Sequence, residues 1–347
     1  MKHLLLLIAI SMSAGAFAQT DNLPEYAPHD RAADPEIIRS WGEPQMAKLM
    51  AAWERGFTEK QPNVRFSDKL MGTETAQAAL YAHVADLAVM GREILMLERH
   101  VMFRREHRLP LEIMVATGSY DVEAKSNALA VFVNKANPVR HLTVAQLDGI
   151  FGDQRTGAWD DKFLWHPEFA RGPEKNIRTW GQLGLTGEWS EKPIHVYGYP
   201  VSIYSPTSGP MMSFRKVAFH GGDMWNPQLR EYDGSARIVT AMQDDPYAIG
   251  YACLCDRSPN IKALPLATNT EGPYIELTKN SVAARTYPLT RSVYVYIDHV
   301  PGEPLDSKVK EFLTYVLSSE GQQAVSAEGD YLPLSPSVAA EQRRKLE

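Results

Sequence analysis

The sequence has little of several features that would mark a hydrolase, a metalloenzyme or a nucleic-acid-binding protein. It contains no Gly-x-Ser-x-Gly motif, and its ten histidines are scattered along the chain rather than clustered. The formal net charge of −6 disfavours nucleic acid as a partner. We therefore expect a binding protein rather than an enzyme, with no cofactor and no metal ion.

Cysteine is also scarce, because the chain holds only Cys253 and Cys255, in the stretch GYACLCDRS. No histidine or further cysteine stands nearby to complete a zinc site. A bridge between thiols one residue apart is strained and uncommon. We expect two buried, unreactive thiols on a strand, with a disulfide as the alternative.

The sequence contains no long hydrophobic run, and its one notable apolar run, at the N-terminus, is short. Lys2 precedes the apolar residues 4–10, and Ala16-Phe17-Ala18 matches a cleavage site with small residues. The run is too short to anchor the chain permanently in a bilayer. We expect residues 1–18 to be a signal peptide, so that a soluble, exported protein begins at Gln19. Loss of Lys2 changes the formal net charge from −6 to −7.

The remaining length, about 330 residues, is typical of two domains or lobes. Apolar strand-like segments alternate with amphipathic helical ones, which favours α/β lobes with largely parallel sheets. Residues 19–35 are polar and contain proline, so we expect a flexible arm there. Residues 152–191 are rich in glycine, tryptophan and charge, and are expected to form loops that pack on a surface.

Three expected helices begin with residue types that suit an anion site. Their first residues are Gly42-Glu43-Pro44, Gly72-Thr73 and Ser208-Gly209-Pro210. Free N–H groups at a helix start bind anions, and parallel strands bring such starts to one edge of a sheet. An ordinary helix cap is the alternative at each position. Asp86 stands in the apolar segment 84–90, where a carboxylate needs a partner: either a local hydrogen bond or a proton on a ligand.

Several longer segments between residues 38 and 334 follow one another in a familiar order. These are IRSWGEPQMAKLMAAWERGF, GTETAQAAL, VADLAVMGRE, ALAVFVNKANPVRHLTVAQLDGIFG, SGPMMSF, DPYAIGYA and RSVYVYIDHVPGEPLDSKVKEFLTYVLSSEGQQAV with YLPL. As a set they resemble the phosphate-binding protein family of bacterial phosphate ABC transporters. Each segment alone would be a weak signal, whereas the shared order and spacing make a strong one.

The resemblance implies a type II periplasmic solute-binding fold, in which two α/β lobes are joined by crossing strands. Lobe 1 would comprise residues 36–127 and 285–347, and lobe 2 residues 128–284, with crossings near 126–134 and 285–297. The implied function is to bind phosphate or a related small oxyanion in the periplasm, as a monomer, for an inner-membrane ABC permease.

The implied ligand residues are only partly those of the family. The candidates are Gly42, Glu43, Gly72, Thr73, Asp86, Arg92, Ser208, Gly209 and Pro210. Asp86 would correspond to the acidic residue that accepts a proton from phosphate, and Arg92 to an arginine that follows it. The departures from the family pattern are Glu43, Gln45, Gly91, Tyr204 and Pro210.

Two of these departures affect charge. A carboxylate at Glu43 either stabilises the dipole of its own helix or repels phosphate from the cleft. Tyr204 replaces a guanidinium group suited to an oxyanion. The alternative function is therefore a repurposed periplasmic sensor or accessory module that binds a different ligand or none.

Overall fold

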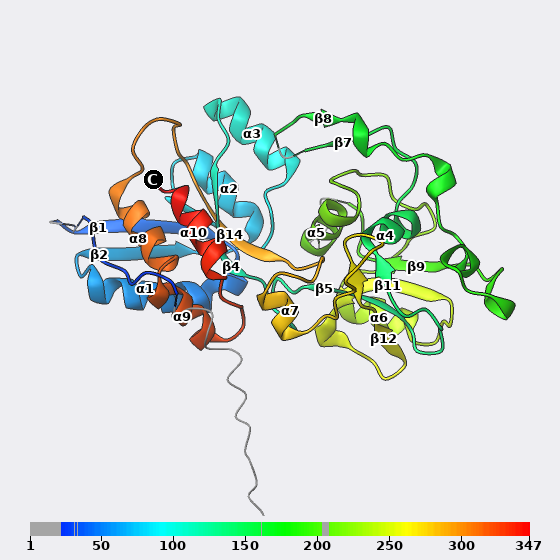
Figure 1. Ribbon diagram of the computed structural model, residues 1–347. Helices are drawn as coiled ribbons and strands as arrows, with labels where there is room; N and C mark the ends of the chain where they lie inside the picture. Colours follow the sequence, from blue (N-terminus) through cyan, green and yellow to red (C-terminus); the bar gives the residue numbers. More distant parts are fainter. Residues whose placement is uncertain (1–21, 31, 33, 161, 203–207) are drawn as a thin grey trace, which may run out of the picture.

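The computed structural model describes residues 22–347 apart from 31, 33, 161 and 203–207, and this chain forms two lobes side by side (Figure 1). Each lobe is built on a five-stranded sheet with helices packed around it. Strands of the first sheet come from residues 36–117 and 292–297, and those of the second from residues 129–263. The first sheet is therefore assembled from two separate parts of the sequence.

The sheet of lobe 1 has the strand order β2-β1-β3-β14-β4. Its strands are β1 (Glu36–Gly42), β2 (Val64–Lys69), β3 (Leu87–Met90), β4 (Leu111–Thr117) and β14 (Ser292–Ile297). Its helices are α1 (Ala47–Lys60), α2 (Thr73–Tyr81), α3 (Met96–Glu106), α8 (Ser307–Val316), α9 (Ser319–Glu328) and α10 (Pro336–Arg344). Strand β1 pairs in parallel with β2 and β3, whereas β14 runs antiparallel to β3 and β4.

The sheet of lobe 2 has the order β10-β9-β11-β5-β12. Its strands are β5 (Leu129–Asn134), β9 (His195–Gly198), β10 (Arg230–Glu231), β11 (Ala248–Cys253) and β12 (Ile261–Ala263). Two short pairs join β6 (Leu142–Thr143) to β13 (Leu266–Ala267) and β7 (Ala158–Trp159) to β8 (Trp165–His166). The helices are α4 (Val144–Phe151), α5 (Ser208–Ala218), α6 (Ser235–Met242) and α7 (Lys279–Ala283).

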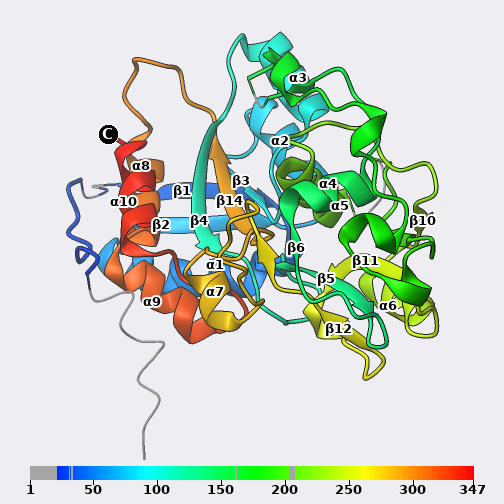
Figure 2. The same cartoon turned by 45° about the vertical axis from the view of Figure 1, so that its right-hand side comes forward.

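The cores follow from the apolar patterns in the sequence. The stripe Leu49, Met50, Trp53 and Phe57 of α1 is fully buried, as its spacing predicts. The C-terminal helices α8, α9 and α10 lie together on the outer side of lobe 1 (Figure 2). Strands β11 and β14 are buried along their whole length, as expected for sheets covered on both faces. No helix of the described chain is both long and apolar enough to span a bilayer.

Strand β3 and helix α3 both begin later than the sequence predicted. Strand β3 starts at Leu87 rather than near residue 84, and the backbone N–H of Asp86 donates to the carbonyl of Arg39 (2.8 Å). The charged segment 93–106 predicts a helix, but helix α3 starts only at Met96. The reason is a cap, since the N–H of Leu95 donates to the carboxylate of Glu98 (2.7 Å).

The described part of residues 19–35 is docked on lobe 1, which differs from the flexible arm that its composition predicted. Leu23 and Tyr26 are buried in the core of lobe 1. The Tyr26 hydroxyl donates to Glu311 (2.6 Å), and its N–H donates to Glu320 (2.8 Å). Buried side chains and hydrogen bonds together therefore attach this otherwise polar segment to lobe 1.

Two crossing segments join the lobes and lie against each other. The N–H of Gly118 donates to the carbonyl of Arg291 (2.9 Å), and the N–H of Leu129 donates to the carbonyl of Leu289 (3.0 Å). The first crossing comes earlier than the expected 126–134, because Leu129 already begins a strand of the second sheet. Arg291 thus stands at the end of the second crossing, where the chain re-enters lobe 1.

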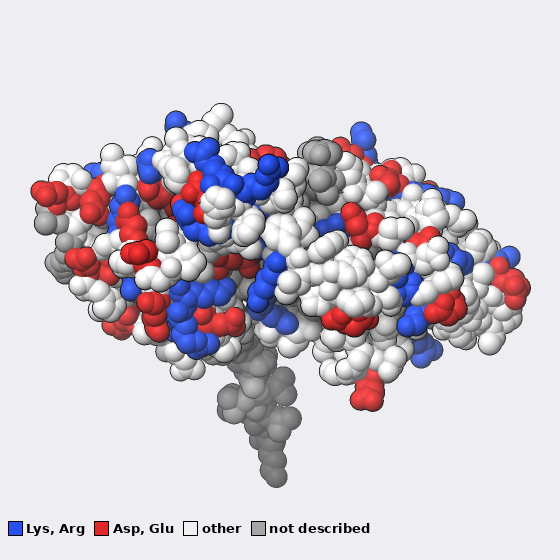
Figure 3. All heavy atoms as spheres, turned by 90° about the horizontal axis from the view of Figure 1, so that it is seen from above, with Lys and Arg blue, Asp and Glu red and all other residues white. Residues whose placement is uncertain are grey.

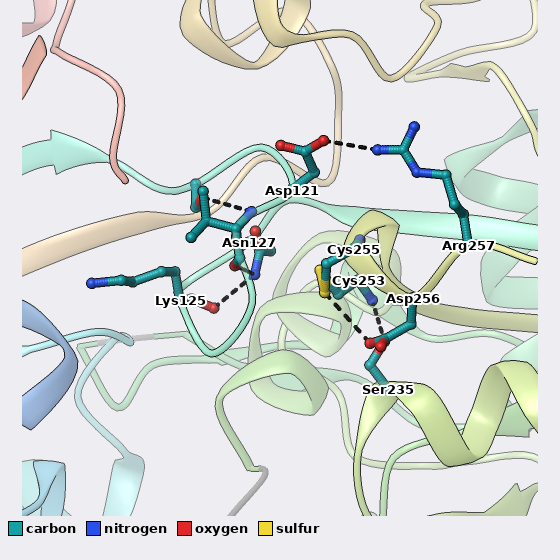
Figure 4. Close-up of a disulfide and its surroundings, with 10 residues drawn as sticks. Asp121, Lys125, Asn127, Ser235, Cys253, Cys255, Asp256 and Arg257 are labelled. Carbon is teal, nitrogen blue, oxygen red and sulfur yellow. Dashed lines mark hydrogen bonds and ion pairs between the residues drawn. A yellow bond between two sulfur atoms is a disulfide. The ribbon is translucent and has the colours of Figure 1, made fainter. Parts of the chain in front are cut away.

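The two cysteines form a disulfide, so the preferred prediction of free thiols is wrong (Figure 4). Cys253 ends β11, and a tight turn returns Cys255 to within 5.2 Å between Cα atoms. The N–H of Cys253 donates to the Ser235 hydroxyl (2.9 Å). Asp256 lies close enough to both sulfur atoms to share an ion, but the disulfide leaves no thiolate ligands there.

Candidate anion site between the lobes

The first two predicted helix starts meet at the ends of β1 and β3. The N–H of Gly72 donates to the carbonyl of Gly42 (2.9 Å), and the N–H of Glu43 donates to the carbonyl of Val89 (2.9 Å). Gly42 has a φ of +137°, and a Cβ placed there would lie 2.0 Å from the Val89 oxygen. Only glycine fits this close approach, which holds the start of α2 beside the turn that leads into α1.

Glu43 interacts with its own helix start, which is one of the two roles that its position suggested, and also with the start of α2. Its Oε1 accepts a hydrogen bond from the N–H of Gln45 (3.3 Å) and so caps the 3-10 turn Pro44–Met46 that precedes α1. Its Oε2 accepts a hydrogen bond from the Thr73 hydroxyl at the start of α2. The Glu43 carboxylate therefore lies between two helix starts, at the edge of lobe 1 that faces lobe 2.

Gly91 follows β3 and makes room for this carboxylate. A Cβ at Gly91 would lie 3.3 Å from Oε2 of Glu43 and 2.7 Å from the hydroxyl oxygen of Ser126. The carbonyl of Gly91 accepts hydrogen bonds from the Ser126 hydroxyl (2.6 Å) and from Nη2 of Arg291 (3.1 Å). The missing side chain at Gly91 thus brings a carboxylate, a hydroxyl and a guanidinium group to one place.

Arg291 is the functional candidate that the sequence reasoning missed. Its side chain is buried, and its Nε has no hydrogen-bond partner among the described residues. Burial lowers the pKa of Arg291, while the nearby Glu93 carboxylate acts in the opposite direction. The one signal in the sequence was a basic residue directly before the apolar strand 292–297. A buried cation with an unused N–H group is ready to bind an anionic acceptor.

The third helix start comes from lobe 2. Helix α5 begins at Ser208, and Pro210 lies in its first turn, as predicted. A Cβ at Gly209 would lie 2.9 Å from Nη2 of Arg291 and 3.6 Å from the Cβ of Arg92. The first turn of α5 therefore contacts both the second crossing and lobe 1. Tyr204 lies outside the described residues.

Asp86 is not part of this cluster, because it precedes β3 while Gly91 follows it. Its Oδ2 accepts hydrogen bonds from the backbone N–H (2.8 Å) and Nε (3.1 Å) of Arg39, and its Oδ1 accepts one from Nη2 (2.8 Å). Burial favours the neutral carboxyl group, but the hydrogen bonds from Arg39 outweigh it and lower the pKa of Asp86. The alternative reading of Asp86, a local partner, is the one that the geometry favours.

Arg92 lies beside the cluster but is already paired. Its Nη1 and Nη2 donate to the two carboxylate oxygens of Glu98, each at 2.8 Å. This two-point pairing satisfies the guanidinium group within lobe 1. Among the predicted candidates, the structure brings together Gly42, Glu43, Gly72, Thr73 and Gly209, with Arg291 added.

Comparisons with known proteins show the family and the fold. A family model described as a PBP superfamily domain matches residues 29–320. The phosphate-binding protein PstS of Pseudomonas aeruginosa is 31% identical over 335 residues, which cover 96% of this chain and 94% of the relative.

Two solved structures have the same fold at low identity. One is an ABC-type phosphate transport receptor from Vibrio cholerae, with 20% identity, a TM-score of 0.53, and coverage of 85% of this chain and 99% of that one. The other is PstS from Borrelia burgdorferi, with 15% identity, a TM-score of 0.54, and coverage of 86% and 99%. The predicted two-lobed α/β fold is confirmed. The chain belongs to the PBP superfamily, in the family of the PstS phosphate-binding proteins.

Proposed function

We propose that this chain is a periplasmic binding protein for hydrogen phosphate, acting as a monomer that serves an ABC permease. The observation that carries the proposal is the buried Arg291, whose Nε has no acceptor among the described residues. It lies against Gly209 at the start of α5 and donates through Nη2 to Gly91. A tetrahedral oxyanion at this junction would accept from the guanidinium group and from backbone N–H groups of the helix starts. The names of the relatives support phosphate as that anion.

Glu43 takes the role that the resemblance had given to Asp86. Its carboxylate lies at the same junction, whereas that of Asp86 is engaged by Arg39. A carboxylate can accept a hydrogen bond only from an oxyanion that still carries a proton. Hydrogen phosphate has such a proton and sulfate at neutral pH has none, so Glu43 selects phosphate. A site built around one hydrogen bond rejects an analogue that lacks it by about 10⁴-fold.

Calorimetric titration of the mature chain with phosphate and with sulfate tests both statements. We expect binding of phosphate alone, with one site per chain. Glu43→Gln removes the negative charge and keeps a group of the same shape, so sulfate should then bind measurably and the preference for phosphate should narrow. Failure of millimolar phosphate to bind would contradict the proposed function. Unchanged rejection of sulfate by the variant would contradict only the role of Glu43.

A second candidate function is a sensor or accessory module for a ligand other than phosphate. The observation that favours it is the charge of Glu43, which is held at the junction by Thr73 and repels fully ionised anions. Native mass spectrometry of protein isolated from the periplasm would detect a retained ligand. This alternative would be supported if a cation or zwitterion were found bound and if calorimetric titration with phosphate showed no binding.

A further inference from the structure

A cavity of about 1200 Å³ lies beside α5, and none of its lining residues belongs to the anion site. Residues 95–97 at the start of α3 supply one wall from lobe 1, and Met212 and Arg215 of α5 supply another from lobe 2. The rest comes from Trp165 and from the segments around residues 154–159, 170–175 and 221–224. In Figure 1 the β7–β8 hairpin reaches from lobe 2 to α3 across the top of the molecule.

The walls of this cavity are mostly apolar, and several of them are open to solvent. Trp159 and Trp165 are 51% and 43% exposed, and their rings meet edge to face at 5.2 Å. Met224 is 49% exposed beside them. Seen from above, the surface near the junction of the lobes shows uncharged atoms with several lysine and arginine groups among them (Figure 3). Exposed aromatic and methionine side chains that line a cavity of this size are typical of a site for an organic molecule.

Glycine at position 157 shapes the aromatic wall. A Cβ at Gly157 would lie 2.5 Å from the indole ring of Trp165, so the ring packs directly on the backbone. Gly157 has a φ of +158°, and it comes just before the short strand that carries Trp159. The two indoles are thus placed by the local chain and need no ligand to hold them.

The floor of the cavity carries an excess of positive charge. Arg155 and Arg171 are both buried there and both pair with the carboxylate of Asp148, while the charges of Asp153 and Glu174 also act on Arg171. Nη2 of Arg171 has no hydrogen-bond acceptor among the described residues. Two guanidinium groups paired with one carboxylate leave a net charge of one cation in a poorly solvated place.

The remaining charged groups of the wall compensate one another. Arg215 pairs with Asp223 (3.1 Å), and Lys175 lines the wall together with Glu174. Among the described residues, the lining side chains together with Asp148 comprise four cations and three carboxylates, which leaves one positive charge in excess. The positive charge would attract an anionic ligand group at long range. If that group stands at one end of an apolar molecule, the rest of the molecule can pack against the apolar walls.

We propose that this cavity is a second ligand site, separate from the anion site, for a small amphipathic organic anion. Such a molecule has an aromatic or alkyl body and one carboxylate or sulfonate group. The body packs against Trp159, Trp165 and Met224, and the charged group lies toward Arg155 and Arg171. Inorganic phosphate does not fit the site, since it has no apolar surface to bury against these walls.

Two dyes of similar shape test the proposal. The probes are 8-anilinonaphthalene-1-sulfonate, which is anionic, and N-phenyl-1-naphthylamine, which is neutral. Fluorescence titration of the folded mature chain should give one site for the anionic dye, with binding about tenfold tighter than that of the neutral dye. Equal binding of the two dyes, or no saturable binding of the anionic one, would overturn the proposed ligand class.

Variants locate the dye. Trp159→Ala and Met224→Ala each remove a half-exposed side chain from the wall. Each should weaken binding of the anionic dye, and Trp159→Ala should weaken it by about tenfold. Met71→Ala removes a side chain that is 76% exposed outside the cavity and should change nothing. Circular dichroism checks that each variant is folded. Unchanged dye binding in both cavity variants would place the dye elsewhere and refute the site.

Discussion

The two ends of strand β3 carry opposite kinds of charge arrangement. Before the strand, Asp86 and Arg39 satisfy each other through several hydrogen bonds. After it, the Glu43 carboxylate and the Arg291 guanidinium group lie around Gly91, and Arg291 keeps an N–H group without a partner among the described residues. A pair that is satisfied within one lobe stabilises that lobe. A buried group left unsatisfied where two lobes meet lowers stability and is retained for a ligand.

The largest effect should come from the backbone at the functional end. Gly42→Ala forces a Cβ to within 2.0 Å of the Val89 carbonyl at a φ of +137°. We expect a loss of about 3 kcal/mol or more in the free energy of unfolding, measured in urea, together with loss of phosphate binding. Gly302→Ala is the matched control, because Gly302 also has a positive φ but no atom within 4 Å of a Cβ.

The control should be destabilised by only about 1 kcal/mol, through backbone strain alone. Equal losses of unfolding free energy in both variants would mean that contact with Val89 does not constrain Gly42. The close approach of the two helix starts would then not determine the geometry of the site.

A smaller effect is expected at the other end of β3. Asp86→Asn removes a charged partner of Arg39, whose side chain is 42% exposed and keeps access to water. We expect a loss of about 1 kcal/mol of stability and no change in phosphate affinity beyond about twofold. Calorimetry on the folded variant would refute this division of roles if affinity fell tenfold or more, because Asp86 would then belong to the binding site.

The smallest effect is the pH dependence of that stability difference. Hydrogen bonds from Arg39 overcome the opposing effect of burial and lower the pKa of Asp86 in the folded state. A carboxyl group of this kind stabilises the fold above its unfolded pKa of about 3.9, and this stabilisation is lost as the pH falls through the folded pKa. The difference in free energy of unfolding between the wild type and Asp86→Asn should therefore reach its full size at about pH 6 and become smaller in acid. A gap that widens in acid would contradict the assigned direction.

The sequence predicted the helix starts well, because Gly42, Gly72 and Gly209 show their role in local residue types. It could not predict Arg291, which is 200 positions away from its partner Gly91 and reaches it only through the second crossing. Asp86 and Glu43 illustrate a related limit. An apolar segment does not show which of its ends faces the other lobe, so the sequence could not place Asp86 and Glu43 relative to the junction of the lobes. The disulfide was likewise missed, because spacing alone favoured free thiols.

The most direct test of the anion site is the phosphate affinity of Arg291→Gln. Arg104→Gln is the control, since it removes an exposed guanidinium group from the last turn of α3. A charge-assisted hydrogen bond contributes about 1.5–3 kcal/mol, so we expect phosphate to bind about 10- to 100-fold more weakly to Arg291→Gln and unchanged to Arg104→Gln. Wild-type affinity in a folded Arg291→Gln protein would contradict the account.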